Sequence, residues 1–313
     1  MRRPTLKHYV EFGALRLALA LVGVLPERVA ISLSGLLGSL AGDVLRIRRT
    51  DVDRHLETAF PEATREWRRR VARASYRHLA REAVATFRLS SSTPEDVLQR
   101  TTVHGLPELK AALREGLGAI VITGHLGNWE IGGASLAARG IPIDAVVFPQ
   151  NNPLFDRHLT GARARLGITS IPKADAGRLV LESLRKGRVT ALVADQNVRT
   201  RSVFVDFFGV PAATAKGPAV FALRTGSPVF LAVALRDSGR PAHYRVLIEP
   251  VPVARTGSLS SDVLGLTRSH VVLLEAHVRG APEQYFWLHR RWKTRPPEVS
   301  EAPGQEPPSE AAV

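Results

Sequence analysis

The sequence predicts an α/β protein in which a central, mainly parallel β-sheet is flanked by helices and preceded by N-terminal membrane-associated helices. From residue 106 onward, short apolar runs rich in β-branched residues alternate with segments of helical length. This alternation favours parallel strands that helices cover on both faces. The apolar N-terminal region lies between basic flanks, which is typical of helices at a membrane interface.

The N-terminal apolar region runs from Val10 to Ile47, and its most apolar stretch is Leu17 to Leu25. That stretch is shorter than the about 20 apolar residues that span a bilayer. We predict one or two helices that lie in the membrane interface or dip into it. A buried pair of core helices and a signal peptide without a convincing cleavage site are the alternatives.

A long amphipathic helix is predicted from Thr64 to Leu89. Its apolar face follows three- and four-residue spacing through Ala72, Tyr76, Leu79, Ala83 and Phe87. The other faces carry eight arginines, at positions 65, 68, 69, 70, 73, 77, 81 and 88. This basic surface either binds lipid headgroups or an acidic protein, or is an ordinary solvated face.

Five strands and five further helices are predicted beyond residue 106. The strands are residues 119–123, 143–148, 189–194, 229–235 and 244–251. The helices are residues 131–139, 154–166, 176–186, 217–225 and 259–279. We therefore divide the chain into a membrane-associated helical region at residues 1–50, an α/β domain at 51–295 and a disordered tail at 296–313. The tail has five prolines, four glutamates and no Lys or Arg.

The composition limits the classes of function. The formal charge is +14, which favours encounters with nucleic acid, an anionic membrane or an acidic protein. Long Lys-rich blocks, typical of nucleic-acid tails, are absent from the sequence. The chain has no cysteine, which excludes disulfides, cysteine nucleophiles and thiolate metal sites.

One histidine stands where α/β enzymes place their chemistry. His125 follows the strand at residues 119–123 directly, and ligands of open α/β sheets collect at the carboxyl ends of the strands. Glu130, five residues later, is predicted to fold back and meet one imidazole nitrogen, which leaves the other nitrogen free as a base. Gly124 and Gly127 allow a tight backbone path, and Asn128 is a candidate helix cap.

Several common catalytic motifs are missing from the sequence. It has no G-x-S-x-G elbow, P-loop, H-E-x-x-H or G-x-G-x-x-G run. Without an obvious Ser or Cys nucleophile beside His125, direct attack by a substrate hydroxyl is favoured over a covalent enzyme intermediate.

Four ordered blocks resemble one enzyme superfamily. The run Thr123-Gly124-His125-Leu126-Gly127-Asn128-Trp129-Glu130 resembles the His-x4-Asp/Glu motif of the lysophospholipid acyltransferase superfamily. Its context is similar to the branch with the late lipid A acyltransferases and the bacterial phosphatidylinositol mannoside acyltransferases. The further blocks are Asn152 to Arg157 with Arg163 and Gly167, then Ala194 to Asn197 with Val203 to Thr214, and finally Pro282 to Lys293.

The resemblance implies a reaction and a location. It implies that His125 is the general base and that Glu130 orients it. In this family, the acceptor hydroxyl attacks an acyl thioester carried by acyl carrier protein or coenzyme A. The implied acceptor is a lipid A-like glycolipid or another membrane glycolipid, at the cytoplasmic face of a bacterial inner membrane. An anionic membrane surface is then a partner, nucleic acid is not, and no metal or tightly bound cofactor is implied.

Five more residues are candidates for substrate contacts. Arg157 and Arg163 are candidates for the oxyanion or an acceptor phosphate, with a surface role as the alternative. Asp195 and Gln196 end a predicted strand and either line the site or serve in capping and loop hydrogen bonds; Asn128 is the fifth. Relatives often have Arg where this chain has Phe148, which indicates a different glycolipid, or an aminolipid, as acceptor.

The segment from Trp287 to Arg295 mixes aromatic and basic residues. We rank simple packing first, with aromatics inward and cations outward, then anchoring at the headgroup level, and single-stranded nucleic acid third. Rival functions are a non-catalytic lipid-binding protein that keeps the fold, a basic nucleic-acid-binding protein, and a hydrolase that transfers acyl groups to water.

Overall fold

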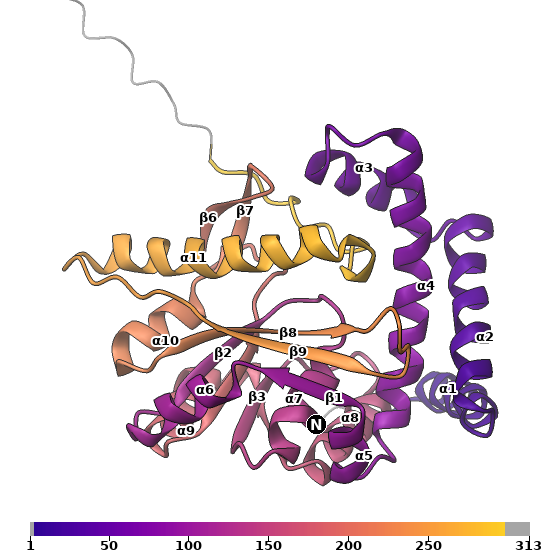
Figure 1. Ribbon diagram of the computed structural model, residues 1–313, viewed down its shortest axis with the longest axis horizontal. Coiled ribbons are helices and arrows are strands. Elements are labelled where there is room, and N and C mark those ends of the chain that lie inside the picture. The colour runs from indigo at the N-terminus through magenta and orange to yellow at the C-terminus, as the bar shows by residue number, and fades with distance from the viewer. Residues whose placement is uncertain (1–2, 298–313) are drawn as a thin grey trace, which may run out of the picture.

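The computed structural model describes residues 3–297 and contains a seven-stranded sheet covered by helices on both faces (Figure 1). The strand order is β1-β9-β8-β2-β5-β3-β4. All neighbours are parallel except β8 and β9, so the predicted α/β class with a mainly parallel sheet is confirmed. The strands are β1 (Thr101–His104), β2 (Ala119–Thr123), β3 (Ile143–Val147), β4 (Ile168–Pro172), β5 (Val189–Val193), β8 (Val229–Arg236) and β9 (Tyr244–Pro250).

The five predicted strands are all present, and β2 lies at the centre of the sheet. Its side chains alternate between two apolar clusters, with Ile120 and Ile122 on one face and Ala119 and Val121 on the other. Burial on both faces explains the continuous apolar run in its sequence. The edge strands β1 and β4 were not predicted, because each is covered less completely and has no such run.

A hairpin of β6 (Ser202–Phe207) and β7 (Val210–Ala215) was also missed by the sequence interpretation. It forms a separate two-stranded sheet that packs against α11 (Figure 1). The predicted helices are found as α7 (Trp129–Ala138), α8 (Pro153–Arg165), α9 (Ala176–Arg185), α10 (Gly217–Thr225) and α11 (Leu259–Gly280). Two short helices, α5 (Pro94–Gln99) and α6 (Leu106–Arg114), flank β1 in the chain.

The predicted long helix is α4 (Arg65–Leu89), and the Thr64 hydroxyl caps it by accepting the Trp67 N–H at 3.2 Å. Its buried face is more polar than the sequence pattern predicted. Ala72 and Tyr76 are buried as predicted, but Ala83 is exposed. Its neighbour Glu82 is buried instead, because Arg236 and other polar groups form hydrogen bonds with its carboxylate.

The N-terminal helices are α1 (Leu6–Gly23) and α2 (Glu27–Ser39), followed by the π-helical turn η1 (Leu40–Val44) and by α3 (Arg49–Ala59). Helices α1 and α2 form a layer beside α4, at the right of Figure 1, whereas α3 lies at the top, on the other side of α4. They are not a buried core pair, because many of their large apolar side chains are exposed, among them Leu6, Val10, Leu17, Leu36 and Val44 at 63–80%. Membrane contact itself stays a prediction.

Within residues 3–297, we find no single helix of sufficient length and apolarity to cross a membrane. One bent pair, Val29–Val44 with Arg49–Ala59, passes by length and composition, with an angle of 91° between its halves. The proposed division of the chain at residues 50 and 295 stays a prediction. Almost all of the predicted disordered tail, residues 298–313, lies outside the described residues.

Glycines let the N-terminal layer approach α4 closely. A Cβ at Gly38 would lie 2.4 Å from the Tyr76 carbonyl oxygen, and one at Gly42 would lie 2.5 Å from the Tyr76 ring. These distances leave no room for a side chain, and the Gly38 contact is with backbone that cannot turn away. The two glycines therefore set the separation between α2, η1 and α4.

We expect Gly38→Ala to lower the free energy of unfolding by about 1–3 kcal/mol, because its methyl group overpacks the contact with α4. Gly265→Ala is the matched control, since nothing lies within 4 Å of a Cβ at this position of α11. The control should be neutral or slightly stabilising, because Ala favours helix over Gly. Equal midpoints for both variants in urea unfolding of detergent-solubilised protein would contradict this account of the contact.

Candidate active site

The turn between β2 and α7 holds His125 in a fixed backbone path. The Asn128 N–H donates to the Ala234 carbonyl of β8 at 2.9 Å, and the Gly127 N–H donates to the Gln284 carbonyl at 3.0 Å. Gly127 has a φ of 65°, and a Cβ there would lie 2.0 Å from the Ala234 oxygen. Only glycine fits that position, as the tight path in the sequence predicted.

The partner of His125 is Asp195, and the predicted contact with Glu130 is wrong. Asp195 Oδ1 lies 2.7 Å from His125 Nδ1, and Asp195 Oδ2 accepts the His125 backbone N–H at 2.7 Å. Asp195 follows β5, which is paired in parallel with β2, so both residues leave the sheet at the same edge. Glu130 is not available for the imidazole because its carboxylate is engaged elsewhere.

The charge of Asp195 is stabilised although the side chain is only 3% exposed. Burial raises the pKa of this carboxyl, but the charge of His125, its two hydrogen bonds and Arg291 outweigh burial and hold the pKa below its usual range. Burial lowers the pKa values of the nearby His270 and His289 to about 4, so both are neutral near pH 7. His125 is the histidine whose ring nitrogen lies within hydrogen-bonding distance of this carboxylate.

An ionised Asp195 fixes the tautomer of His125. The carboxylate accepts only, so Nδ1 carries the proton and Nε2 presents its lone pair. The Gln196 amide nitrogen lies 3.2 Å from that Nε2 and donates to it. The ring also contacts Trp129, at 4.6 Å between centroids, and Phe286, at 5.9 Å. The arrangement leaves one basic nitrogen, currently held by an amide.

Glu130 lies in the first turn of α7, as predicted, and forms an ion pair with Arg163 of α8. Arg163 Nε donates to Glu130 Oε2 at 2.9 Å, and a second, shorter bond joins Arg163 Nη2 to Oε1. Burial lowers the pKa of Arg163, but the hydrogen bonds and charge of Glu130 more than offset it and raise the pKa. Arg157 is exposed and donates to the Pro153 carbonyl at 3.5 Å, consistent with the alternative surface role.

Asn128 caps α7 as predicted, because its Oδ1 accepts the Ile131 N–H at 3.1 Å. Asn128 is 2% exposed, and its contact with substrate stays a prediction. The amide nitrogen donates to Glu82 of α4 at 2.8 Å and to Thr86 at 3.1 Å. The turn is therefore tied to α4 as well as to the sheet.

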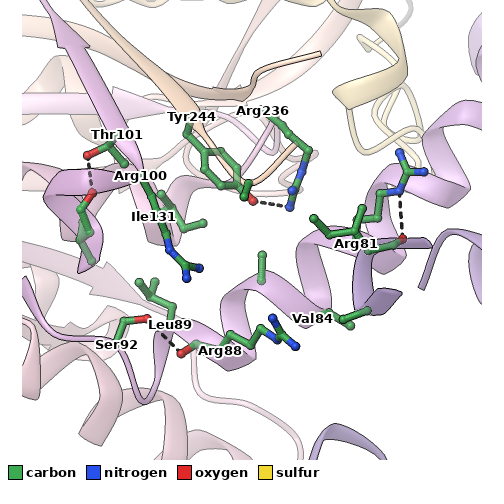
Figure 2. Close-up of a pocket in the computed structure, with 15 residues that line it drawn as sticks. Arg81, Val84, Arg88, Leu89, Ser92, Arg100, Thr101, Ile131, Arg236 and Tyr244 are labelled. Carbon is green, nitrogen blue, oxygen red and sulfur yellow. Dashed lines mark hydrogen bonds between the residues drawn. The ribbon is translucent and has the colours of Figure 1, made fainter. Parts of the chain in front are cut away.

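Glu82 is the centre of a buried network that the sequence interpretation missed. It accepts from Arg236 Nε at 2.5 Å and from the Tyr244 hydroxyl at 2.8 Å. Arg236 and Tyr244 border a cavity of about 40 Å³ that Arg81 and Ile131 also line (Figure 2). The only sequence signal for this network was the spacing of Ser75, His78 and Glu82, which places three polar residues on one face of α4.

The segment from Trp287 to Arg295 packs against the core through Trp287 and Trp292, as ranked first from the sequence. Trp287 is 1% exposed, and its indole N–H donates to the Pro282 carbonyl at 2.6 Å. One cation departs from the predicted outward orientation. Arg291 is 2% exposed and donates to the Ala213 carbonyl at 2.8 Å, because the β6–β7 hairpin supplies acceptors for it.

Within residues 3–297, no group of three or more His, Asp or Glu side chains is placed to share a metal ion. The side chains at the carboxyl end of β2 instead form an acid–base pair with an amide beside it. The prediction that the reaction needs no metal or cofactor is not tested by this geometry.

The comparisons with known proteins define the class of this enzyme: it is an acyltransferase that acts on a lipid acceptor. The chain belongs to the family of bacterial lipid A biosynthesis acyltransferases, whose family model matches residues 3–294. The resemblance drawn from the sequence blocks is thereby confirmed.

Characterised relatives cover most of the chain at low identity. The lipid A biosynthesis acyltransferase of Haemophilus influenzae is 27% identical over 278 residues, which cover 88% of this chain and 86% of the relative. The lipid A biosynthesis palmitoleoyltransferase of Escherichia coli is 28% identical over 274 residues, 87% of each chain. A phosphatidylinositol mannoside acyltransferase of Mycobacterium tuberculosis is 28% identical over 194 residues, 61% of this chain and 59% of the relative.

We expect Asn128→Asp to lower the free energy of unfolding by at least about 2 kcal/mol. The new carboxylate keeps the cap of α7 but replaces the donor that faces Glu82, which sets two buried like charges side by side. Asn152→Asp is the control, because Asn152 also caps a helix through Oδ1, which accepts the Leu154 N–H of α8 at 3.0 Å, and its amide lies 3.4 Å from the carboxylate of Glu11, which is 49% exposed and therefore screened by solvent. Similar urea midpoints for the two variants would show that Glu82 does not depend on the Asn128 amide.

Proposed function

We propose that this enzyme transfers a fatty acyl chain from a thioester donor, acyl carrier protein or coenzyme A, to a hydroxyl of a lipid A-like glycolipid, with His125 as general base. The observation that carries the proposal is the Asp195–His125 pair, which leaves Nε2 unprotonated at the sheet edge where α/β enzymes bind ligands. Family membership supplies the reaction class. The names of relatives that act in lipid A biosynthesis support the acceptor.

The proposed reaction begins when the acceptor hydroxyl displaces the Gln196 amide from Nε2. His125 Nε2 takes the hydroxyl proton while the oxygen attacks the thioester carbonyl carbon, and Asp195 stabilises the imidazolium. The tetrahedral intermediate then expels the thiolate, which receives the proton from Nε2. The displaced Gln196 amide stays within reach of the oxyanion and can donate to it. The products are the acyl ester and the free thiol.

Glu130 acts through Arg163 in this proposal. The bidentate pair joins the first turn of α7 to α8 and fixes the guanidinium, whose remaining N–H groups can face an acceptor phosphate or the oxyanion. Glu130 is then a positioning residue, and its removal frees Arg163 to move. This assignment keeps both residues of the His-x4-Glu motif in the site while giving them different partners.

Near the end of β3, the protein residue proposed to contact the acceptor headgroup differs from the Arg that relatives often carry. Phe148, where relatives often carry Arg, is 53% exposed, and Lys173 Nζ lies 4.1 Å above the centre of its ring. A cation–π contact of this kind holds a positive charge at the site edge. In this proposal, Lys173, which follows the neighbouring strand β4, supplies the positive charge that Arg would supply at position 148. Its compact ammonium group would contact an acceptor phosphate in a different position.

The proposed place of action is the cytoplasmic face of a bacterial inner membrane. The exposed apolar side chains of α1, α2 and η1 form a surface suited to the membrane interface. The formal charge of +14 attracts anionic phospholipid and an acidic acyl carrier protein alike. We propose that α1 and α2 lie on the membrane with the α/β body above it.

The proposed function predicts a specific lipid phenotype. In cells lacking the gene, one glycolipid should be lighter by one acyl chain, and wild type should restore it while His125→Ala should not, because the variant has no base. Mass spectrometry of extracted lipids measures this and names the acceptor. An unchanged lipid profile in the deleted strain, or full restoration by His125→Ala, would contradict the proposal.

The two carboxylates should differ in their effect on the pH profile. Asp195→Asn should lower kcat by about 10³-fold or more near neutral pH, because an amide no longer fixes the Nδ1–H tautomer or stabilises the imidazolium. Glu130→Gln should lower the rate without moving the apparent pKa of the kcat profile. Glu130→Ala and Arg163→Ala should be strongly non-additive in the double variant. A moved profile in Glu130→Gln, with a normal one in Asp195→Asn, would restore Glu130 as the partner of the base.

A further inference from the structure

A groove of about 650 Å³ lies between α3, η1 and the first half of α4, at the upper right of Figure 1. Its lining is dominated by arginine. The six arginines, which we call the arginine groove, are Arg46, Arg49, Arg65, Arg68, Arg69 and Arg73. This site is separate from His125 and is used by no step of the proposed reaction.

Only part of this charge is neutralised. Arg49 pairs with Asp43 at 3.3 Å and with Asp53 at 2.9 Å. Arg73 shares Asp43 at 3.1 Å, and Arg68 lies 3.7 Å from Glu57. Six arginines against three carboxylates leave a formal excess of three positive charges.

The excess resides in three exposed side chains. Among the residues that the structure describes, Arg46, Arg65 and Arg69 have no acidic partner, although each lines the groove. Arg65 and Arg69 are one helical turn apart on α4, so their side chains share a face. Arg46 is in the left-handed region with a φ of 51°, a conformation that costs a non-glycine residue stability. Three unpaired guanidinium groups from two elements therefore converge on one hollow.

The residues that flank Arg46 in the chain are apolar and exposed. Leu45 and Ile47, which flank Arg46 in the chain, are 63% and 47% exposed. Val44 is 67% exposed, and α2 also carries exposed leucines, at positions 33, 36 and 37. Exposed aliphatic side chains on both sides of Arg46 in the chain match a bilayer, where phosphate lies beside hydrocarbon, better than a protein surface dominated by carboxylates.

We propose that the arginine groove binds the phosphodiester headgroup of an anionic phospholipid in the bilayer beneath α2 and η1. Guanidinium groups bind phosphate oxygens in a bidentate manner, and the groove volume is of the size that receives such a group. The proposal rests on the membrane contact proposed above and is independent of the chemistry at His125.

The groove is mechanically connected to the active site. His55 Nδ1 of α3 lies 2.7 Å from the Trp287 carbonyl oxygen, and Arg48 donates to the Leu288 carbonyl at 3.1 Å. The same segment carries Phe286, whose N–H donates to the His125 carbonyl at 3.0 Å. A lipid bound in the groove therefore fixes the height and tilt of His125 relative to the bilayer surface.

The test compares binding of the full chain to vesicles of phosphatidylcholine alone and of phosphatidylcholine with phosphatidylglycerol. The triple variant Arg46→Gln/Arg65→Gln/Arg69→Gln should bind the anionic vesicles about 100-fold more weakly than wild type, since each lost cation near the surface weakens binding about fivefold. Its binding to neutral vesicles should not change, because the apolar surface of α1 and α2 is intact.

The matched control removes the same charge elsewhere. Arg114→Gln/Arg185→Gln/Arg224→Gln changes three exposed arginines on α6, α9 and α10, which lie at the opposite side of the molecule from α3 and α4 (Figure 1). This variant should lose less than about threefold, because charges beyond a Debye length of the surface are screened. Single variants at Arg65 and at Arg69 should each lose about fivefold and keep the test open if the triple variant unfolds.

Three results would overturn the proposal. In the first, the groove and control variants lose equal vesicle affinity. In the second, phosphatidylglycerol does not change the vesicle affinity of wild type. In the third, the groove variant loses binding to acidic acyl carrier protein but keeps its binding to anionic vesicles. Failure of wild type to bind neutral vesicles would instead count against the apolar contact of α1 and α2. A groove-dependent response to phosphatidylglycerol would still support the headgroup site in that case.

Discussion

The active-site turn depends on the buried carboxylate of Asp195, which accepts two hydrogen bonds from His125. Asp195 holds both the backbone and the ring of His125, one oxygen for each. Such a charge is costly to bury unless its bonds are complete, and here the cation Arg291 contributes as well. Because β2 and β5 are parallel neighbours, the sheet brings both residues to one edge, and the position of His125 beside Asp195 follows from the strand order.

A second buried carboxylate secures the other end of the same turn. Glu82 binds the amide of Asn128, which caps α7, and Arg236 balances its charge. His125 and Glu130 thus stand on a segment that is fixed at its start by the sheet and at its end by α4. Both anchors are ionic and buried, so loss of one partner leaves an unpaired charge, and the geometry of the turn is correspondingly strict.

The sequence predicted the parts of the fold that burial marks clearly. Strands covered on both faces, such as β2 and β8, give continuous apolar runs, whereas the edge strands β1 and β4 give none. In the site, His125 was found because it follows β2 directly. Its partner was assigned to the nearest acid, Glu130, and the true contact with Asp195 spans 70 positions. Adjacency of that kind is created by the order of strands in the sheet, which no local pattern contains.

Helix α4 unites the two halves of the molecule because its faces serve different partners. Glu82 and Tyr76 point inward, toward the active-site turn and the N-terminal layer, while Arg65 and Arg69 point into the arginine groove. The position of α4 relative to η1 is set by Gly38 and Gly42, where no side chain fits. A rigid helix with these contacts transmits orientation and not motion. In the proposed reaction the acceptor headgroup remains in the bilayer and must present its hydroxyl at a defined height, and a fixed distance between the proposed membrane-contacting surface and His125 would meet that requirement.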